Sequence, residues 1–170
     1  YLDNVKSIAE ELDAEMYEVI CSKLSDFNHY EISNFAKDGY CSRHNLCYWK
    51  NNCYYGFGLG ASGYLRDVRY SNTRSITHYL QRKYRYEEEK LSIYDKMEYE
   101  VILNLRTKFG ISKEQFFTRY HKQLVDVYDY SKLVLDGYLV ETENLIFIPS
   151  NYWYLSNEII VRLLEECSYC

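Results

Sequence analysis

Residues 30–63 of the chain read YEISNFAKDGYCSRHNLCYWKNNCYYGFGLGASG. The run 30–36 predicts a strand that ends in a polar turn. Residues 42–51 then place arginine, histidine, asparagine and two aromatic side chains in one short segment. Glycines follow at every second position from 56 to 60, where the backbone is open to close approach by other atoms. Because these residue types are poorly suited to a core, we expect a binding site here.

The composition of the whole chain limits its functional class. A chain of 170 residues can bury a core for one domain or two small ones, and 47% hydrophobic residues are typical of a folded protein. The net charge of −5 opposes binding to nucleic acid and to anionic membranes. No apolar run approaches the ~20 residues of a membrane span, so we expect no stable membrane insertion. The chain begins without methionine or a signal peptide, which predicts a piece of a longer protein.

The six cysteines predict reduced thiols and a cytoplasmic location, because no secretory signal accompanies them. Cys41, Cys47 and Cys53 recur every six residues, but six helical steps turn about 600° and point the thiols in different directions. This spacing matches no compact zinc or iron–sulfur pattern, so we expect no metal site. Cys167 and Cys170 form a CxxC that lacks the strand and helix context of a redox motif.

The first half of the chain predicts an α-then-β order. Apolar residues spaced by threes and fours indicate an amphipathic helix over residues 3–23, with Asp3 as its N-cap. Residues 27–33 predict a strand, and residues 54–63 a second strand or strand-turn. The segment 64–72 is expected to be a short extended piece that leads into a linker.

The second half is predicted to be mainly helical. Residues 75–85 indicate a helical patch, and the charged run 87–90 is expected to be solvated. A long helix is predicted over 93–109, ending at Gly110. Ser112, with a glutamine three residues later, has the pattern of a capping box that begins a short helix.

A hairpin and a last helix complete this half. One more helix is predicted over 122–135. Residues 138–141 and 145–148 alternate around a polar turn, which indicates a β-hairpin, and Ser156 is expected to cap the final helix. Three helices followed by a β-wing is the order of a winged-helix domain.

The first block carries a long motif. It comprises Tyr30–Ala36, Gly39, Ser42–Leu46, Tyr48, Trp49, Tyr55, Gly56, Gly58, Gly60, Ala61, Tyr64 and Arg69–Asn72. This pattern closely resembles the oxygen-independent coproporphyrinogen III oxidase-like radical S-adenosylmethionine (SAM) proteins, and within them the heme chaperone branch more than the true oxidases. The oxidase alternative stays open on these residues.

The resemblance implies an α+β fold. Residues 1–73 would be the C-terminal end of a radical SAM barrel, and residues 74–170 a mainly helical, winged-helix-like domain. Family members carry a CxxxCxxC loop for a [4Fe-4S] cluster and a glycine-rich SAM motif, both near the N-terminus, and neither occurs in this chain. The expected cofactors of the parent protein are therefore the [4Fe-4S] cluster and SAM, and heme is a further candidate. The chain by itself is expected to be a C-terminal fragment without catalytic residues or radical chemistry.

The resemblance also implies the site residues. In the chaperone branch a His-Asn-x-x-Tyr motif is implicated in heme handling. The expected contacts to heme or a coproporphyrinogen-like tetrapyrrole are His44, Tyr48, Asn45 and Arg43, and the expected cofactor contacts are Gly58, Gly60 and Ala61. The alternatives are a structural histidine, an asparagine that holds its turn, and glycines that only turn a strand at a barrel rim. Ser62 stands where the family usually has histidine, which puts a role for Ser62 in doubt.

A basic zone follows, interleaved with tyrosines. Arginine pairs with carboxylates such as those of porphyrins, and tyrosine rings can stack on a macrocycle. A solvated linker and helix face is the simpler interpretation. The zone comprises Arg66, Arg69, Arg74, Arg82, Lys83 and Arg85, with Tyr64, Tyr70, Tyr79 and Tyr84.

A winged-helix module that binds DNA or protein without catalysis is the rival hypothesis. Acidic side chains surround the two lysines of the candidate recognition helix and also occupy the wing, so phosphate repulsion argues against nucleic acid. These residues are Lys122, Lys132, Asp126, Asp129, Asp136, Glu141 and Glu143. The exposed edges of an incomplete barrel would favour a homo-oligomer.

Overall fold

The computed structural model describes residues 10–167 of the chain. The N-terminal part consists of helix α1 (Glu10–Lys23), strands β1 (Asn28–Glu31) and β2 (Asn34–Ala36), and helix α2 (Arg43–Trp49). Residues 3–9 of the predicted first helix, with the Asp3 cap, lie outside the described residues. From Glu10 onward the predicted helix is confirmed.

Strands β1 and β2 form an antiparallel hairpin, so the prediction of one strand over 30–36 is wrong. The reason is the carboxylate of Glu31, which is fully buried and accepts hydrogen bonds inside the turn. The backbone N–H of Ser33 donates to Glu31 Oε2 at 3.1 Å, and Asn34 Nδ2 donates to Oε1. The side chain of Glu31 thus folds the chain back on itself.

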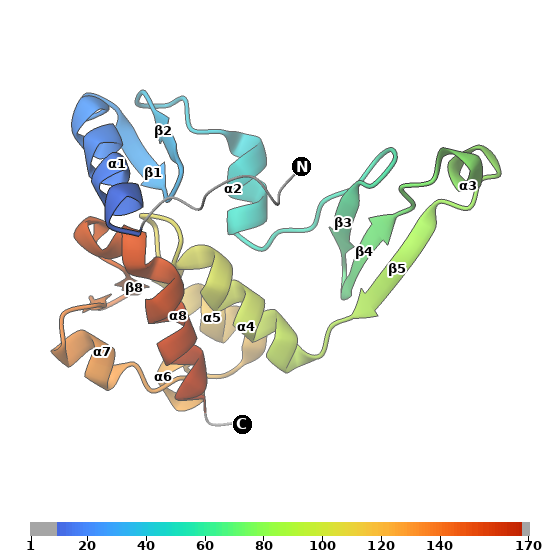
Figure 1. The fold of residues 1–170 in the computed structure, drawn as a ribbon. Coiled ribbons are helices and arrows are strands. Elements are labelled where there is room, and N and C mark those ends of the chain that lie inside the picture. Colours follow the sequence, from blue (N-terminus) through green and yellow to red (C-terminus); the bar gives the residue numbers. More distant parts are fainter. Residues whose placement is uncertain (1–9, 168–170) are drawn as a thin grey trace.

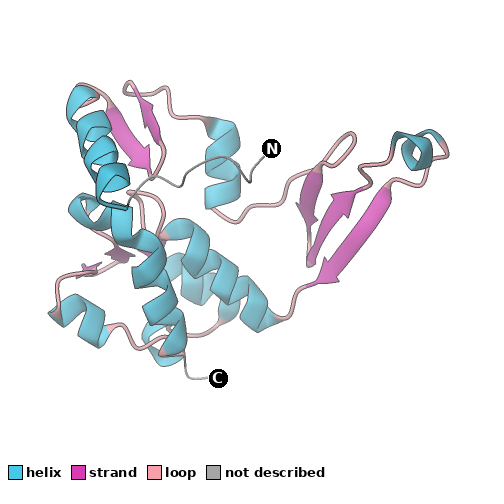
Figure 2. Cartoon of the chain, viewed as in Figure 1, coloured by secondary structure: helices cyan, strands magenta, loops and turns pink. Residues whose placement is uncertain are grey.

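A three-stranded antiparallel sheet extends away from the helical body as an arm (Figures 1 and 2). Its strands, in spatial order, are β3 (Ser62–Leu65), β4 (Val68–Asn72) and β5 (Arg85–Lys90), and helix α3 (Ile76–Leu80) lies between β4 and β5 in the chain.

The charged run 87–90 is exposed, as expected, but its backbone forms strand β5, which was not predicted. Although every residue of β5 is exposed, its backbone pairs with β4 from Val68 opposite Lys90 to Asn72 opposite Arg85. These residues therefore form a strand through backbone pairing with β4, while their side chains remain exposed to solvent. The predicted boundary after residue 73 falls inside this sheet.

The C-terminal part holds the main core. Its elements are α4 (Ile93–Asn104), β6 (Ile111–Ser112), α5 (Lys113–Tyr120), α6 (Leu124–Val127), α7 (Ser131–Leu135), β7 (Val140–Glu141), β8 (Leu145–Phe147), the 3-10 helix η2 (Ser150–Leu155) and α8 (Ser156–Glu165). The small sheet has the order β6-β8-β7, and β7 and β8 form the predicted hairpin.

Several predicted helix boundaries in this part change. Helix α4 ends at Asn104, well before Gly110. At this end of the helix, Thr107 Oγ1 donates to Asn104 O at 2.9 Å and closes the turn. The Ser112 cap is confirmed, because Ser112 Oγ accepts from Gln115 N at 3.2 Å. Ser156 is instead the first residue of α8 and forms no side-chain cap.

The helix predicted over 122–135 is two short helices, α6 and α7. Tyr128 between them has an extended backbone (φ −128°, ψ 117°) and pairs with Cys167 in an isolated bridge. The buried side chain of Tyr128 joins the core, so packing interrupts a pattern that is helical in sequence.

The N-terminal part is joined to this core by backbone and ring contacts. The N–H of Ile32 donates to Arg106 O, and the N–H of Lys108 donates to Tyr30 O, each at 3.1 Å. The ring of His29 lies edge-on to Trp153, with 4.5 Å between centroids, and Trp153 is 2% exposed. The hairpin is therefore part of one packed body with the C-terminal helices.

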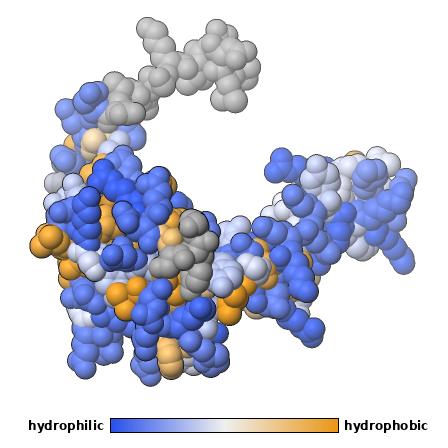
Figure 3. Space-filling model, turned by 90° about the horizontal axis from the view of Figure 1, so that it is seen from below, coloured by the Kyte–Doolittle hydropathy of each residue, from blue (hydrophilic) through white to orange (hydrophobic). Residues whose placement is uncertain are grey.

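The surface is largely hydrophilic on the face drawn in Figure 3, with apolar side chains gathered in small separate patches. Among residues 10–167, no helix combines the length and apolar character that crossing a membrane requires.

Candidate functional site

Helix α2 carries the histidine motif, and a serine fixes where it begins. Ser42 has an extended backbone, and its Oγ accepts from the N–H of Asn45 at 3.2 Å. The N–H of Ser42 donates to the hydroxyl oxygen of buried Tyr30 at 3.3 Å. The start of α2 is thereby attached to β1.

His44 and Tyr48 lie on one face of α2, as their i, i+4 spacing requires. The Oη of Tyr48 and the Nε2 of His44 are hydrogen-bonded at 2.7 Å, and the rings are nearly perpendicular, with centroids 4.7 Å apart. His44 is exposed and Tyr48 half-buried, so the imidazole is accessible from solvent and is not enclosed in the core.

Tyr54 continues this row of rings toward the arm. Its ring meets Tyr48 edge to face, with 4.4 Å between centroids, and its backbone exchanges two hydrogen bonds with Tyr64 of β3 at 2.8 and 2.9 Å. Burial raises the pKa of the Tyr54 phenol, and the charge of Arg69 opposes that rise. Tyr54 also borders a cavity of about 580 Å³ on the sheet.

The remaining motif residues on α2 have separate places. Arg43 is exposed at the first position of the helix, and Asn45 is half-buried, with its backbone N–H used in the serine cap. Ser62, which replaces the usual histidine of the family pattern, lies in β3 with its Oγ 3.2 Å from Ser71 Oγ.

The glycine loop is held by Asn72, a residue not predicted to have this role. Asn72 Nδ2 donates to Gly56 O at 3.1 Å and to Gly58 O at 3.0 Å, while its backbone N–H donates to Ala61 O at 2.8 Å. Gly58 and Gly60 have φ of +96° and +65°, which favour glycine. The only sequence signal for Asn72 was its place at the end of the motif.

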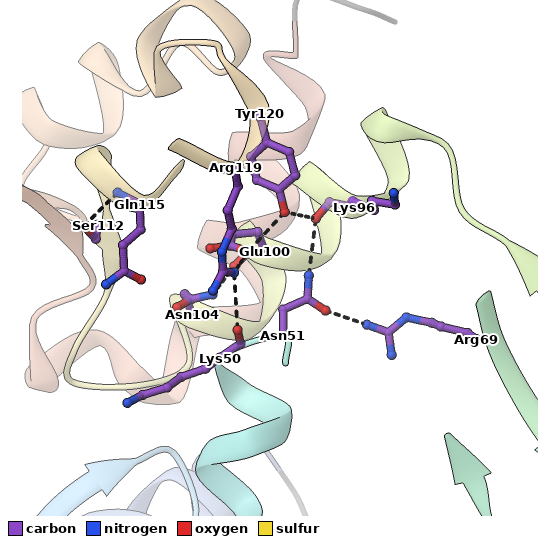
Figure 4. Close-up of polar contacts among 10 residues, drawn as sticks. All are labelled: Lys50, Asn51, Arg69, Lys96, Glu100, Asn104, Ser112, Gln115, Arg119 and Tyr120. Carbon is purple, nitrogen blue, oxygen red and sulfur yellow. Dashed lines mark hydrogen bonds and ion pairs between the residues drawn. The ribbon is translucent and has the colours of Figure 1, made fainter. Parts of the chain in front are cut away.

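Two arginines of the basic zone stabilise the arm from within. Arg69 donates to Asn51 Oδ1 at 2.9 Å (Figure 4) and lies 3.8 Å from the ring centroid of Tyr99, which connects the arm to the residues after α2 and to α4. Arg85 lies 3.3 Å from the Tyr70 centroid and donates to Asn72 Oδ1 at 2.9 Å. Arg85 Nε also pairs with Glu88 Oε1 at 3.2 Å, whereas the buried Nε of Arg69 has no hydrogen-bond partner among the described residues.

The described residues do not fit an iron–sulfur cluster. Within residues 10–167, no group of three or more cysteine, histidine, aspartate or glutamate side chains could hold a metal ion. The cysteines described there are unpaired thiols, and Cys170 lies outside that range. No chemical step is therefore assigned here through a cluster.

Comparison with known proteins identifies similar chains. The heme chaperone HemW of Lactococcus lactis is 36% identical over 165 residues, and that of Bacillus subtilis 34% over 166 residues. These matches cover 93% and 92% of this chain but 44% of each relative, so the chain spans less than half of their length. No protein-family model matches the chain.

One solved structure has a similar fold. The coproporphyrinogen III oxidase HemN of Escherichia coli, described as a radical SAM enzyme, matches with a TM-score of 0.70 at 14% identity. The match covers 96% of this chain and 42% of HemN, and corresponds to its C-terminal region. The α+β fold expected from the sequence is confirmed.

Proposed function

Because the chain is homologous over most of its length to the HemW heme chaperones, we propose that it supplies tetrapyrrole contacts in a heme-handling radical SAM protein. The cargo is heme, and the contact is the face of α2 that carries His44 and Tyr48. The observation that carries this proposal is that His44 and Tyr48 lie in contact on an accessible helix face.

His44 is the proposed iron ligand, through a neutral Nε2. When Nδ1 carries the ring proton, the phenol of Tyr48 donates to Nε2 and occupies its lone pair. Ligation then requires the phenol to turn away from the ring. Imidazole binds iron without losing a proton, whereas the Tyr48 phenol must lose one to bind as phenolate, and this difference favours His44.

The neighbouring residues suit the rest of a flat, anionic macrocycle. The rings of Tyr48 and Tyr54 provide aromatic surface beside the imidazole. Arg43, exposed one residue before His44, offers a guanidinium to a carboxylate of the cargo. Asn45 supports this arrangement through the helix cap.

The glycine loop and the division of the chain into two units are also part of the proposal. Gly58, Gly60 and Ala61 have little or no side chain, so a cofactor can approach the backbone of this loop closely. The hydrogen bonds of Asn72 hold the loop in shape without a cofactor. We propose a barrel end and a winged-helix-like unit, with the division moved from residue 73 to Lys90 because β5 pairs with β4. SAM and a [4Fe-4S] cluster belong to the proposed parent protein, and radical chemistry is not assigned to this chain.

Hemin titration of the 170-residue chain tests the proposal. We expect a shifted Soret band that His44→Ala removes. The matched control is His78→Ala, because His78 is likewise exposed on a short helix capped by serine. Retention of the band in His44→Ala, or equal loss in His78→Ala, would contradict the assignment of the ligand.

DNA binding by the winged-helix-like unit is a weaker candidate, and no contact favours it. The wing residue Glu141 pairs with Lys113 Nζ at 2.6 Å, and this hydrogen bond lowers the pKa of the Glu141 carboxyl. The ammonium group of Lys113 is thereby balanced by Glu141 and is not left for a phosphate backbone. Salt-dependent retention of the chain on duplex DNA would revive this candidate.

A further inference from the structure

A second cavity, of about 450 Å³, lies where the end of α2 meets the α4–β6 turn and the start of α5. It is within the size range of small-molecule sites. Its polar and aromatic lining includes Lys50, Asn52, Lys108, Phe109, Gln115 and Arg119. We call it the lysine pocket.

The lysine pocket lies on the opposite side of α2 from the proposed heme contact. Leu46 of α2 and its C-cap residue Lys50 line it, and they follow His44 and Tyr48, respectively, by two residues. Two helical steps turn about 200°, so the two pairs of side chains point in nearly opposite directions. The pocket is therefore a separate site.

The lining carries positive charge without an acid. Three cations border the pocket, and no aspartate or glutamate does. The Arg119 charge is balanced by Glu100, whose Oε2 accepts from Nη1 at 2.6 Å. Lys108 Nζ donates to the neutral amide oxygen of Asn28 at 2.6 Å, and Lys50 Nζ lies 5.8 Å from the Phe109 ring centroid. Within residues 10–167, neither lysine forms an ion pair.

Neutral donors surround the same space. The amide side chains of Asn52, Asn104 and Gln115 line the pocket, and Figure 4 draws Asn104 on α4 and Gln115 on α5. Ser112 Oγ also borders the pocket and accepts from the Gln115 N–H, which leaves its own O–H able to donate. Two ammonium groups without a carboxylate partner, with hydroxyl and amide donors in the same lining, are stabilised by an anion.

The chemistry of the cations selects the anion. The planar fork of Arg119, which would clamp a carboxylate with two hydrogen bonds, is already used on Glu100. The available groups are two ammonium point charges, which suit phosphate. Phe109, 40% exposed, has both ammonium groups over its ring, with Nζ of Lys50 at 5.8 Å and Nζ of Lys108 at 5.5 Å from the centroid, so this ring holds the two charges beside the pocket. We infer that the lysine pocket binds the phosphate group of a small molecule.

Calorimetric titration of the full chain with pyrophosphate tests this inference. We expect binding that the double variant Lys50→Ala/Lys108→Ala weakens about tenfold or more, with the melting temperature almost unchanged because both lysines are exposed. Lys108→Gln removes the charge but keeps a donor for Asn28, so it should also weaken binding. The matched control is Lys37→Ala, since Lys37 similarly lies over the ring of Phe27, at 6.0 Å, outside the pocket.

Titration with ADP tests whether the phosphate belongs to a nucleotide, and titration with citrate tests whether the pocket prefers phosphate to carboxylate. ADP binding tighter than pyrophosphate assigns a nucleotide, and equal affinity assigns a phosphate group without a base. Absence of pyrophosphate binding at millimolar concentration, equal loss in Lys37→Ala, or citrate binding as tightly as pyrophosphate would overturn the inference. None of these readouts depends on heme.

Discussion

Arg119 covers the carboxylate of Glu100 at the junction of α4 and α5. Its Nη1 donates to Glu100 Oε2 at 2.6 Å, and the Glu100 side chain is 4% exposed whereas that of Arg119 is 36% exposed. Tyr120 Oη donates to the same oxygen at 3.1 Å, and burial is the main cause that raises the pKa of this phenol. Figure 4 shows that the network continues through the Lys96 carbonyl to Asn51 and Arg69.

We expect Arg119→Ala to lower the free energy of unfolding by about 2 to 3 kcal/mol, because it leaves a buried carboxylate without its cation. The loss is below that of a fully buried pair, since water reaches the guanidinium. Urea denaturation measures it. Arg162→Ala on α8, an exposed arginine above the Tyr138 ring, is the control and should cost much less. Equal losses would show that the carboxylate does not depend on Arg119.

Gly63 is expected to tolerate no side chain. An added Cβ would lie 2.2 Å from Tyr70 Cζ, and this ring is 5% exposed beneath Arg85. We expect Gly63→Ala to destabilise the chain by about 2 kcal/mol through overpacking. Gly137→Ala, where φ is +79° but the space is open, should cost about 1 kcal/mol from backbone strain alone.

Thermal unfolding compares the two glycine variants. In the Tyr70→Leu background, Gly63→Ala should cost less than it does in the wild type, because the clashing ring is gone. A cost for Gly63→Ala that does not change in this background would refute the steric explanation.

His29 makes stability depend on pH. Its ring stacks on Phe35 at 3.9 Å, and Nε2–H donates to Ile32 O at 3.0 Å. Burial is the main cause that lowers the pKa of His29 below 6.5, so the unfolded chain takes up this proton first. The stability contributed by neutral His29 is present above pH 6.5 and is lost as the pH falls through the lowered folded pKa.

Urea denaturation at pH 7.5 and pH 5 measures this dependence. We expect the wild type to lose more stability between these two pH values than His29→Phe, which keeps an aromatic ring but cannot take up a proton. The same pH dependence in both proteins would show that His29 does not control it.

Tyr48→Phe distinguishes the possible iron ligands of the proposed heme contact. Removing the phenol frees the lone pair of His44 Nε2, so we expect hemin binding to persist with an imidazole-type visible spectrum. Tyr54→Phe, which keeps the neighbouring ring, is the control and should leave the spectrum unchanged. Loss of the spectrum in Tyr48→Phe alone would assign the iron to the phenolate oxygen instead.

Local spacing is enough to predict several features. Ser112 caps α5 because a serine and the amide three residues later meet within one turn. The hairpin of β7 and β8 follows from alternation around a polar turn. The contact of His44 with Tyr48 follows from one helical repeat, and the motif that contains them is long enough to indicate the family from the residues alone.

Tertiary contacts decided the rest, because the deciding partners are distant in sequence. Glu31 is buried where it pairs with Thr107, distant in sequence, and its carboxylate then takes donors from its own turn, while the acidic β5 becomes a strand through backbone pairing with β4. Arg69 and Arg85, basic candidates in sequence, are used on tyrosine rings and asparagines. The sequence by itself determined the local caps, the repeats and the motif. Only the tertiary structure decided which charges remain free for a ligand, because neutralisation depends on groups brought together by folding.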